Sequence, residues 1–127
     1  MTSIIDHIGF PVSDFERAKA FYVALFEPLG IKLLVDFSHE GKQHAGFGNG
    51  RPEFWIGTGK PAQSGMHVAL QASTRAAVDA FYAAGLANGG TDNGAPGIRA
   101  HYHPDYYGAF IYDLDGNNVE AVCHAPA

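Results

Sequence analysis

Four features are scarce or missing in this sequence, and each excludes a class of protein. Cysteine occurs once, at Cys123, so the chain cannot form an internal disulfide and does not depend on an oxidising compartment. Eight scattered basic residues against thirteen acidic ones argue against nucleic acid as a partner. No apolar run approaches the roughly 20 residues that span a bilayer. Residues 1–6 lack the charged-then-apolar start of a signal peptide, so we expect no membrane association and a cytoplasmic location.

The length and composition fit one compact domain. The chain has 127 residues, of which 46% are hydrophobic and 17% charged, as is typical of globular proteins. We therefore predict a single domain over residues 1–127. Seven of the residues are histidines, and neutral histidine is a common metal ligand and proton carrier near pH 7. Whether these histidines indicate a metal site or a proton-transfer site depends on their positions in the sequence.

An internal repeat divides the chain into halves. Shifting the sequence by 60 positions lays residues 6–14 over 66–74 and aligns His7 with His67. The same shift aligns further positions downstream: Ala20, Phe21, Tyr22, Ala24 and Gly30 with Ala80, Phe81, Tyr82, Ala84 and Gly90. Repetition at a fixed spacing indicates that both halves share one structural plan. We predict module one over about 1–60 and module two over about 61–127.

Each half is predicted to form a strand, a helix and three further strands. Alternating apolar residues predict the opening strands over 4–12 and 66–72. Ser13 and Glu16 have the spacing of a capping box, so a helix is expected from about Asp14, with its end at Pro28 and Gly30. The second helix, about 74–86, lacks such a box. Short runs separated by turn residues predict the other strands, over 32–37, 43–48, 53–56, 98–103, 106–112 and 118–123.

The last strands of the two halves align with an offset of 67, which lays Glu53 over Glu120. Module two must then contain extra residues, and we assign them to a glycine-rich loop over 89–97. Loops of this kind can close over a cavity. Residues 115–117 are expected to form the tight turn before the last strand.

Three motifs together resemble one known family. They are Asp-His-Ile-Gly at 6–9, Met-His-Val at 66–68 and Asp-Leu-Asp-Gly-Asn-Asn-Val-Glu-Ala-Val at 113–122. This combination resembles the vicinal oxygen chelate superfamily, which includes glyoxalase I, extradiol dioxygenases, fosfomycin-resistance transferases and bleomycin-binding proteins. The resemblance implies an α+β fold in which paired βαβββ modules form a curved, cup-shaped mixed sheet.

The resemblance also implies a metal site inside the cup. The family's ligand positions lie on the first and last strands of the modules, and here they carry His7, His67 and Glu120. Side chains alternate across a strand, so these three can point into one concavity. Two histidines and one carboxylate leave coordination positions open, which suits Fe, Mn, Ni or Zn. The implied cofactor is one divalent metal ion of unknown identity.

A fourth ligand position is ambiguous in the sequence. Glyoxalase I uses a residue from the last strand of module one, where this chain offers Glu53 or Trp55. A carboxylate kept beside apolar Trp55 would have a raised pKa, so Glu53 is a candidate general base. A solvent-facing glutamate after a proline turn is an equally good interpretation.

Further candidates lie near the penultimate strand. We expect the catalytic candidates to be Glu53, His103 and Tyr107, and the substrate contacts to be Trp55, Tyr106 and Phe110. His103 or Tyr107 could donate a proton to a substrate oxygen. Surface hydrogen bonding is the alternative for His103 and Tyr107, and core packing is the alternative for Phe110.

Two function classes follow from these residues. The first is a metal-dependent enzyme, a glyoxalase-like lyase or isomerase or a dioxygenase, whose small-molecule substrate chelates the ion through oxygen atoms. The second is a non-catalytic protein that binds small molecules or antibiotics, of the bleomycin-resistance type, although those proteins generally lack the ligand set. Fosfomycin transfer ranks third, because only seven residues follow Glu120 and those enzymes carry further basic contacts there.

The resemblance finally implies a homodimer, because an open curved sheet leaves edge strands that can pair between chains. The sequence leaves open whether one cup forms within a chain or between two.

Overall fold

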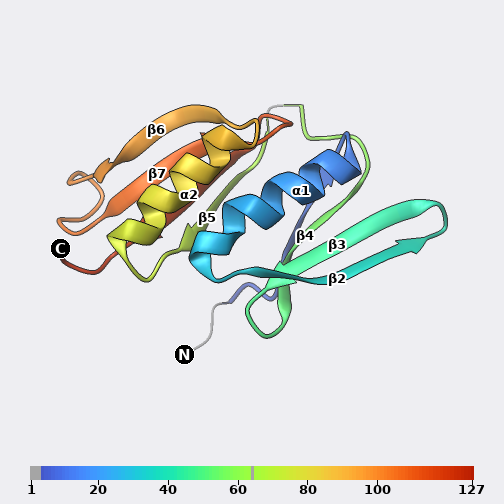
Figure 1. The fold of residues 1–127 in the computed structure, drawn as a ribbon, viewed down its shortest axis with the longest axis horizontal. Coiled ribbons are helices and arrows are strands. Elements are labelled where there is room, and N and C mark those ends of the chain that lie inside the picture. The colour runs from blue at the N-terminus through green and yellow to red at the C-terminus, as the bar shows by residue number, and fades with distance from the viewer. Residues whose placement is uncertain (1–3, 64) are drawn as a thin grey trace.

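The computed structural model describes residues 4–63 and 65–127 and shows both helices on the near side of the strands (Figure 1). The first half contains β1 (Ile8–Val12), α1 (Phe15–Phe26), the short 3-10 helix η1 (Glu27–Leu29), β2 (Lys32–His39), β3 (Lys42–Gly48) and β4 (Pro52–Thr58). The second contains β5 (His67–Gln71), α2 (Arg75–Ala87), β6 (Thr91–Ile98), β7 (Tyr107–Tyr112) and β8 (Asn118–Cys123). The two βαβββ repeats predicted from the sequence are therefore confirmed.

The strands form two mixed sheets with the same internal order. One has the order β1-β4-β3-β2 and the other β5-β8-β7-β6. In each sheet the first and last strands of the module pair in parallel, and the remaining pairs are antiparallel. The α+β class is confirmed. The eight strands lie in two separate sheets of four and do not close into a barrel.

The third strand of module two differs from the prediction. The segment expected to be a loop over 89–97 contains most of β6, and the strand expected over 98–103 is absent. β6 lies at the edge of its sheet, and its register with β7 shifts twice around Gly94. An edge strand tolerates such breaks and also Pro96, which cannot donate a ladder hydrogen bond. The extra residues of module two are found in the β6–β7 connection over 99–106, whereas the corresponding turn in module one spans only 40–41.

The start of α1 also corrects the prediction. Asp14, not Ser13, is the N-cap, and its carboxylate accepts a hydrogen bond from the backbone N–H of Arg17 at 3.2 Å. Asp is as good an N-cap as Ser, so the sequence pattern could not separate the two positions. The hydroxyl of Ser13 instead donates to Asp115 at 2.5 Å, in module two. The N-cap of α2 is Thr74, which accepts from the N–H of Ala77 at 3.0 Å.

Aromatic side chains fill the core beneath the helices. The Tyr22 and Phe26 rings of α1 lie 4.9 and 5.0 Å from the Phe54 ring of β4. Phe81 of α2 is fully buried in the same core. Each buried aromatic of this size contributes roughly 1.5–3 kcal/mol. The helices thus cover one face of each sheet and leave the opposite face uncovered by helices.

A buried hydrogen-bond network joins the two modules. The Tyr22 hydroxyl in module one donates to the Asp113 carboxylate in module two at 2.5 Å. Asp113 also accepts from the backbone N–H groups of Asp115 and Asn117 and from the Asn117 side-chain amide. Gly116 adopts a positive φ of 83° within this turn, which confirms the tight turn predicted before the last strand.

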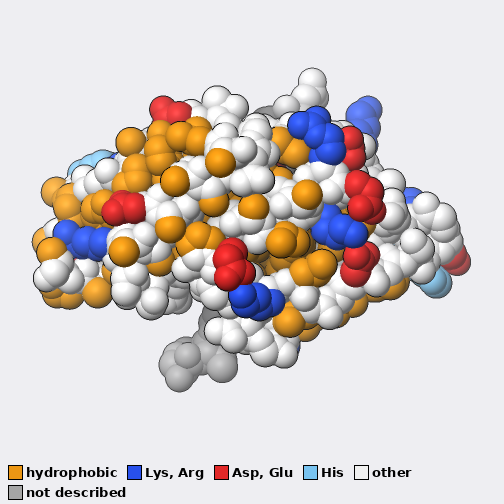
Figure 2. Space-filling model, in the orientation of Figure 1, with side chains coloured by type: hydrophobic (Ala, Val, Ile, Leu, Met, Phe, Trp, Pro, Cys, Tyr) orange, Lys and Arg blue, Asp and Glu red, His pale blue; other side chains and the backbone are white. Residues whose placement is uncertain are grey.

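Charged residues on the helical face lie close to residues of opposite charge. Figure 2 shows Lys and Arg side chains beside Asp and Glu side chains on this face. One such group pairs Lys19 with Asp36 at 2.8 Å and with Glu16 at 3.4 Å. Neither α1 nor α2 has the length and apolar composition that a membrane-spanning helix requires, within the residues that the structure describes.

Candidate metal and substrate site

The strands of module two carry the candidate residues on the face turned away from α2, which we call the open face of module two. Val68 and Leu70 of β5 and Val119 and Ala121 of β8 pack on the core side. Because side chains alternate along a strand, His67 and Glu120 point to the open face. Gly108 and Phe110 of β7 share that face, and Phe110 is paired directly with Glu120.

His67 and Glu120 meet on this face. The His67 Nε2 atom lies 3.0 Å from the Glu120 Oε1 atom. The Glu120 side chain is only 3% exposed, whereas that of His67 is 55% exposed. A carboxylate so deeply buried needs charged or hydrogen-bonding partners to offset the loss of water. The structure therefore places two of the three predicted ligands in contact.

Tyr106 is the second partner of Glu120. Its hydroxyl donates a hydrogen bond to the Glu120 Oε2 atom. Burial, and then the Glu120 carboxylate, raise the pKa of Tyr106 well above its usual range, while Arg99 has a smaller lowering effect. The phenol therefore remains protonated, and a donor, at neutral pH. Tyr106 is a predicted substrate contact, and in the structure it is also bonded to Glu120.

Gly108 makes room for this link. A Cβ at position 108 would lie 3.1 Å from Cε1 of Tyr106 and 3.5 Å from Oε2 of Glu120. Any other residue would therefore crowd the Tyr106 ring where it crosses the sheet.

Arg99 is a candidate site residue that was not predicted from the sequence. Its guanidinium lies 5.3 Å from the centroid of the Phe110 ring and donates to the backbone carbonyls of Ala95 and Gly97 at 2.8 and 2.9 Å. No carboxylate lies within 4.0 Å of it in the described ranges 4–63 and 65–127. One signal could have found it: Arg99 is the single Lys or Arg after Arg75 in the sequence.

His7 lies apart from the other two predicted ligands. It immediately precedes β1, and its Nδ1 atom is 2.7 Å from the Asp6 Oδ1 atom. Hydrogen bonding to His7, and then the charge of Arg51, lower the pKa of Asp6. The His7 side chain is 59% exposed. Nowhere in the described residues do three or more His, Cys, Asp or Glu side chains come together as a metal site.

The strand register resolves the ambiguity between Glu53 and Trp55. Gly9 pairs with Trp55 in module one, and Ala69, its counterpart in the repeat, pairs with Glu120 in module two. Trp55, not Glu53, thus occupies the position equivalent to Glu120, and the offset of 67 is wrong by two residues. Because indole cannot replace a carboxylate as a ligand, module one offers no equivalent of Glu120 at this position.

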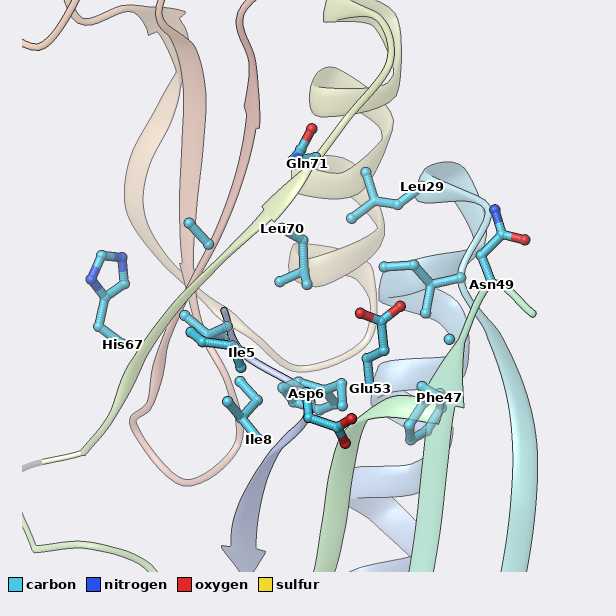
Figure 3. A pocket seen from close by; sticks show the side chains of 15 residues that line it. Ile5, Asp6, Ile8, Leu29, Phe47, Asn49, Glu53, His67, Leu70 and Gln71 are labelled. Atoms are coloured by element: carbon cyan, nitrogen blue, oxygen red, sulfur yellow. The ribbon is translucent and has the colours of Figure 1, made fainter. Parts of the chain in front are cut away.

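Glu53 of β4 and His67 of β5 both line the same groove. This groove of about 600 Å³ lies between the modules, with apolar lining residues such as Leu29 and Leu70. Figure 3 shows Glu53 and His67 among the residues that line this groove. The Glu53 side chain is 53% exposed, and its carboxylate is 4.0 Å from Arg51. The burial that its predicted role as a general base required is therefore lacking.

Comparison with known proteins agrees with these observations. A sequence profile of the Glyoxalase/Bleomycin resistance protein/Dioxygenase superfamily matches residues 4–121. The chain belongs to this superfamily. A search of curated proteins gave no match.

Solved structures of the superfamily share the whole fold. A glyoxalase/bleomycin resistance protein from Albidiferax ferrireducens is 32% identical, with a TM-score of 0.75, and the match covers 95% of this chain and 99% of that one. A variant of the fosfomycin resistance protein FosX from Listeria monocytogenes, in complex with Mn(II) and a dihydroxypropylphosphonic acid, is 20% identical, with a TM-score of 0.71 and coverage of 96% and 90%. A glyoxalase I variant from Zea mays is 21% identical, with a TM-score of 0.71, and the match covers 97% of this chain and 45% of that one.

Two predicted catalytic residues of this superfamily member, Tyr107 and His103, make hydrogen bonds to residues other than Glu120. Tyr107 points to the helical face, where its hydroxyl donates to Asp79 of α2 at 2.6 Å and its ring lies under Arg75. The alternation of β7 puts Tyr107 and Phe110 on opposite faces, so the structure does not bring Tyr107 to the site. His103 lies in the exposed 99–106 connection and accepts from the N–H of Asp105 at 3.0 Å.

The open face of module one carries an aromatic cluster. The rings of Phe37 and His44 are stacked with centroids 5.0 Å apart, and Trp55 lies 6.4 Å from Phe37. Trp55 and His44 line a shallow cavity of about 260 Å³ together with Pro11. This cluster suits contact with a flat apolar molecule.

The donor atoms present fit a divalent metal ion in part. His67 Nε2 and Glu120 Oε1 are adjacent, and imidazole with carboxylate suits first-row transition metals. The Asp6 contact occupies the Nδ1 atom of His7 and leaves its Nε2 atom free, an arrangement common for metal-bound histidine. Module two thus carries two candidate ligands, and His7 is a third candidate that lies elsewhere in the same chain.

Proposed function

We propose that this protein is a metal-dependent enzyme that acts on a small molecule through a site shared between two copies of the chain. His67 and Glu120 of one copy and His7 of a second copy hold one divalent ion. The observation that carries this proposal is the contact of His67 with a buried Glu120 on an open sheet face. A buried carboxylate paired with a half-exposed histidine is costly as a purely structural feature, whereas a metal site explains both.

Several features support a site between copies. His7 is exposed and is separate from the His67 and Glu120 pair among the described residues. β1 and β5 are edge strands, and each pairs on one side only. Exposed edges of this kind can be covered when a second chain associates. A symmetric dimer that joins module one of each copy to module two of the other would form two equivalent sites.

The side chains around the ion would have distinct tasks. When bound, the ion would act as a Lewis acid that polarises substrate oxygens. Tyr106 fixes one oxygen of Glu120 by its hydrogen bond, so the other oxygen faces His67. Phe110 provides an apolar wall next to Glu120. Proton transfer during the reaction is assigned to His103, whose ring contacts the ring of His124. His124 in turn contacts the ring of Tyr106, the hydrogen-bond partner of Glu120.

Metal titration of the purified protein tests the proposal. We expect Mn(II), Fe(II), Ni(II) or Zn(II) to bind with a stoichiometry of about one ion per chain, measured by calorimetry on the metal-free protein. Oxygen consumption by the Fe(II) form would favour ring cleavage, whereas activity of the Ni(II) or Zn(II) form would favour lyase or isomerase chemistry. Failure of all four ions to bind above background would contradict the proposal.

One observation favours a second candidate function. The Phe37, His44 and Trp55 cluster could hold an aromatic ligand without any reaction. Binding of such a ligand that survives His7→Ala and His67→Ala would support a non-catalytic binding protein. The cytoplasmic location stays a prediction from the sequence.

A further inference from the structure

We propose that Arg99 binds an acidic group of the substrate, so that the substrate class is small carboxylic acids that also carry metal-chelating oxygens. This assignment rests on the proposed function, because it concerns the same open face of module two. It goes further by naming the charge of the molecule and the residue that selects it.

The position of Arg99 supports this assignment. Its guanidinium lies over the Phe110 ring, and Phe110 is paired with Glu120 on the neighbouring strand. Directly paired residues on adjacent strands have Cβ atoms about 5 Å apart. Arg99 and Glu120 are therefore both neighbours of Phe110. A small molecule that lies over Phe110 could reach the ion with one end and Arg99 with the other.

Two glycines leave room for the guanidinium in this position. A Cβ at Gly94 would lie 2.9 Å from Cδ1 of Phe110 and 3.1 Å from an Nη atom of Arg99. A Cβ at Gly97 would lie 3.3 Å from the other Nη atom. The absence of side chains at both positions allows the Arg99 side chain to fold back along β6 and lie over the Phe110 ring. The position of the guanidinium therefore depends on glycine at both sites.

The charge of Arg99 is not neutralised within its surroundings. The two hydrogen bonds that it makes go to neutral carbonyls, and three of its five N–H groups have no hydrogen bond in the structure of residues 4–63 and 65–127. A partly buried cation without a counter-charge is costly, and a carboxylate bound by two N–H groups would satisfy it. If Arg99 served only to stabilise the fold, its two hydrogen bonds to backbone carbonyls would be sufficient.

A matched pair of ligands separates these two roles. Catechol and 3,4-dihydroxybenzoate carry the same chelating oxygens, and only the second carries a carboxylate at neutral pH. With the Mn(II)-loaded protein, calorimetry should give an affinity at least about tenfold higher for the acid than for catechol. Arg99→Gln should remove that preference and leave catechol binding unchanged. Arg99→Lys should retain part of it, since the charge remains without the planar pair of donors.

The experiment also separates this inference from the proposed function. In the metal-free protein, 3,4-dihydroxybenzoate should bind more weakly but still in a way that depends on Arg99, and Arg99→Gln should not change the affinity for Mn(II). Equal binding of acid and catechol by the wild-type protein would overturn the assignment of Arg99. An acid preference that survives in Arg99→Gln, in a variant with unchanged thermal unfolding, would overturn it as well.

Discussion

Replacement of His67 by alanine is expected to lower the affinity of the protein for Mn(II) by at least about 100-fold, because each copy then supplies Glu120 without its neighbouring imidazole. The same result is expected for Glu120→Gln, which removes the anionic oxygen that faces His67 Nε2 at 3.0 Å. Either change should leave the fold intact, since the His67 side chain is half-exposed and glutamine keeps the shape of Glu120.

Calorimetry with Mn(II) on metal-free protein measures this effect. His39→Ala is a matched control, because His39 is an exposed histidine on β2 that belongs to neither predicted half of the site. It should bind Mn(II) as the wild-type chain does. If His67→Ala bound Mn(II) with the affinity of the wild-type protein, the ion would be held by other residues.

Replacement of Asp113 by alanine is expected to destabilise the protein by about 4 kcal/mol, because several buried donors lose their acceptor at once. Asp113 accepts from the Tyr22 hydroxyl, from two backbone N–H groups and from the Asn117 amide. Tyr22→Phe removes one of these bonds and should cost about 1–3 kcal/mol. Because Tyr22 and Asp113 belong to different modules, both changes weaken the joint between them.

Denaturant unfolding monitored by the fluorescence of Trp55 measures these costs. Tyr82→Phe is the control, because the hydrogen bond from Tyr82 to Asp92 lies at the surface and should contribute less than about 1 kcal/mol. Equal unfolding midpoints for Tyr22→Phe and Tyr82→Phe would contradict the role of the network.

The same network gives a direction for the pH dependence of stability. Burial, and then the charge and hydrogen bond of Asp113, raise the pKa of Tyr22 above its ordinary value of 10.0. A group whose pKa is raised by folding stabilises the native state fully below its unfolded-state pKa. The contribution of Tyr22 should therefore be complete below about pH 10 and decrease at higher pH, and Tyr22→Phe should lack this decrease.

The repeated plan of the fold could be predicted from the sequence because its signals are local. Alternating residues predicted β1 and β5, and Pro28 and Gly30 predicted the end of α1. The alignment of His7 with His67 correctly identified equivalent positions at the start of each module. These features depend on the spacing of residue types along the sequence and not on contacts between distant residues.

The errors occur where long-range contacts decide the structure. β6 contains Gly94, Pro96 and Gly97, which indicate a loop by composition, and only its edge position in the sheet makes it a strand. Ser13 matched a capping box, but Asp115 from module two takes its hydroxyl. Residue propensities contain no information about a partner that lies 102 positions away.

The candidate site was predictable as a set of residues and not as a geometry. Glu120 and His67 could be named from their motifs, and the structure brings them together. The choice between Glu53 and Trp55 required the strand register, which differs from the sequence alignment by two residues. Arg99 lies outside every motif, and its place over Phe110 depends on glycines whose effect is visible only in three dimensions.

The central claim is that one metal site uses His7 from one copy and His67 with Glu120 from another. It can be tested by mixing two inactive chains, His7→Ala and the double variant His67→Ala with Glu120→Gln, in equal amounts, followed by unfolding and refolding. Neither variant alone should bind Mn(II). In a random mixture half of the dimers contain both chains, and each of these has one complete site, so we predict about one bound Mn(II) per four chains. Absence of any bound Mn(II) in the refolded mixture, from a wild-type protein that binds it, would contradict the shared site and place all three ligands within one chain.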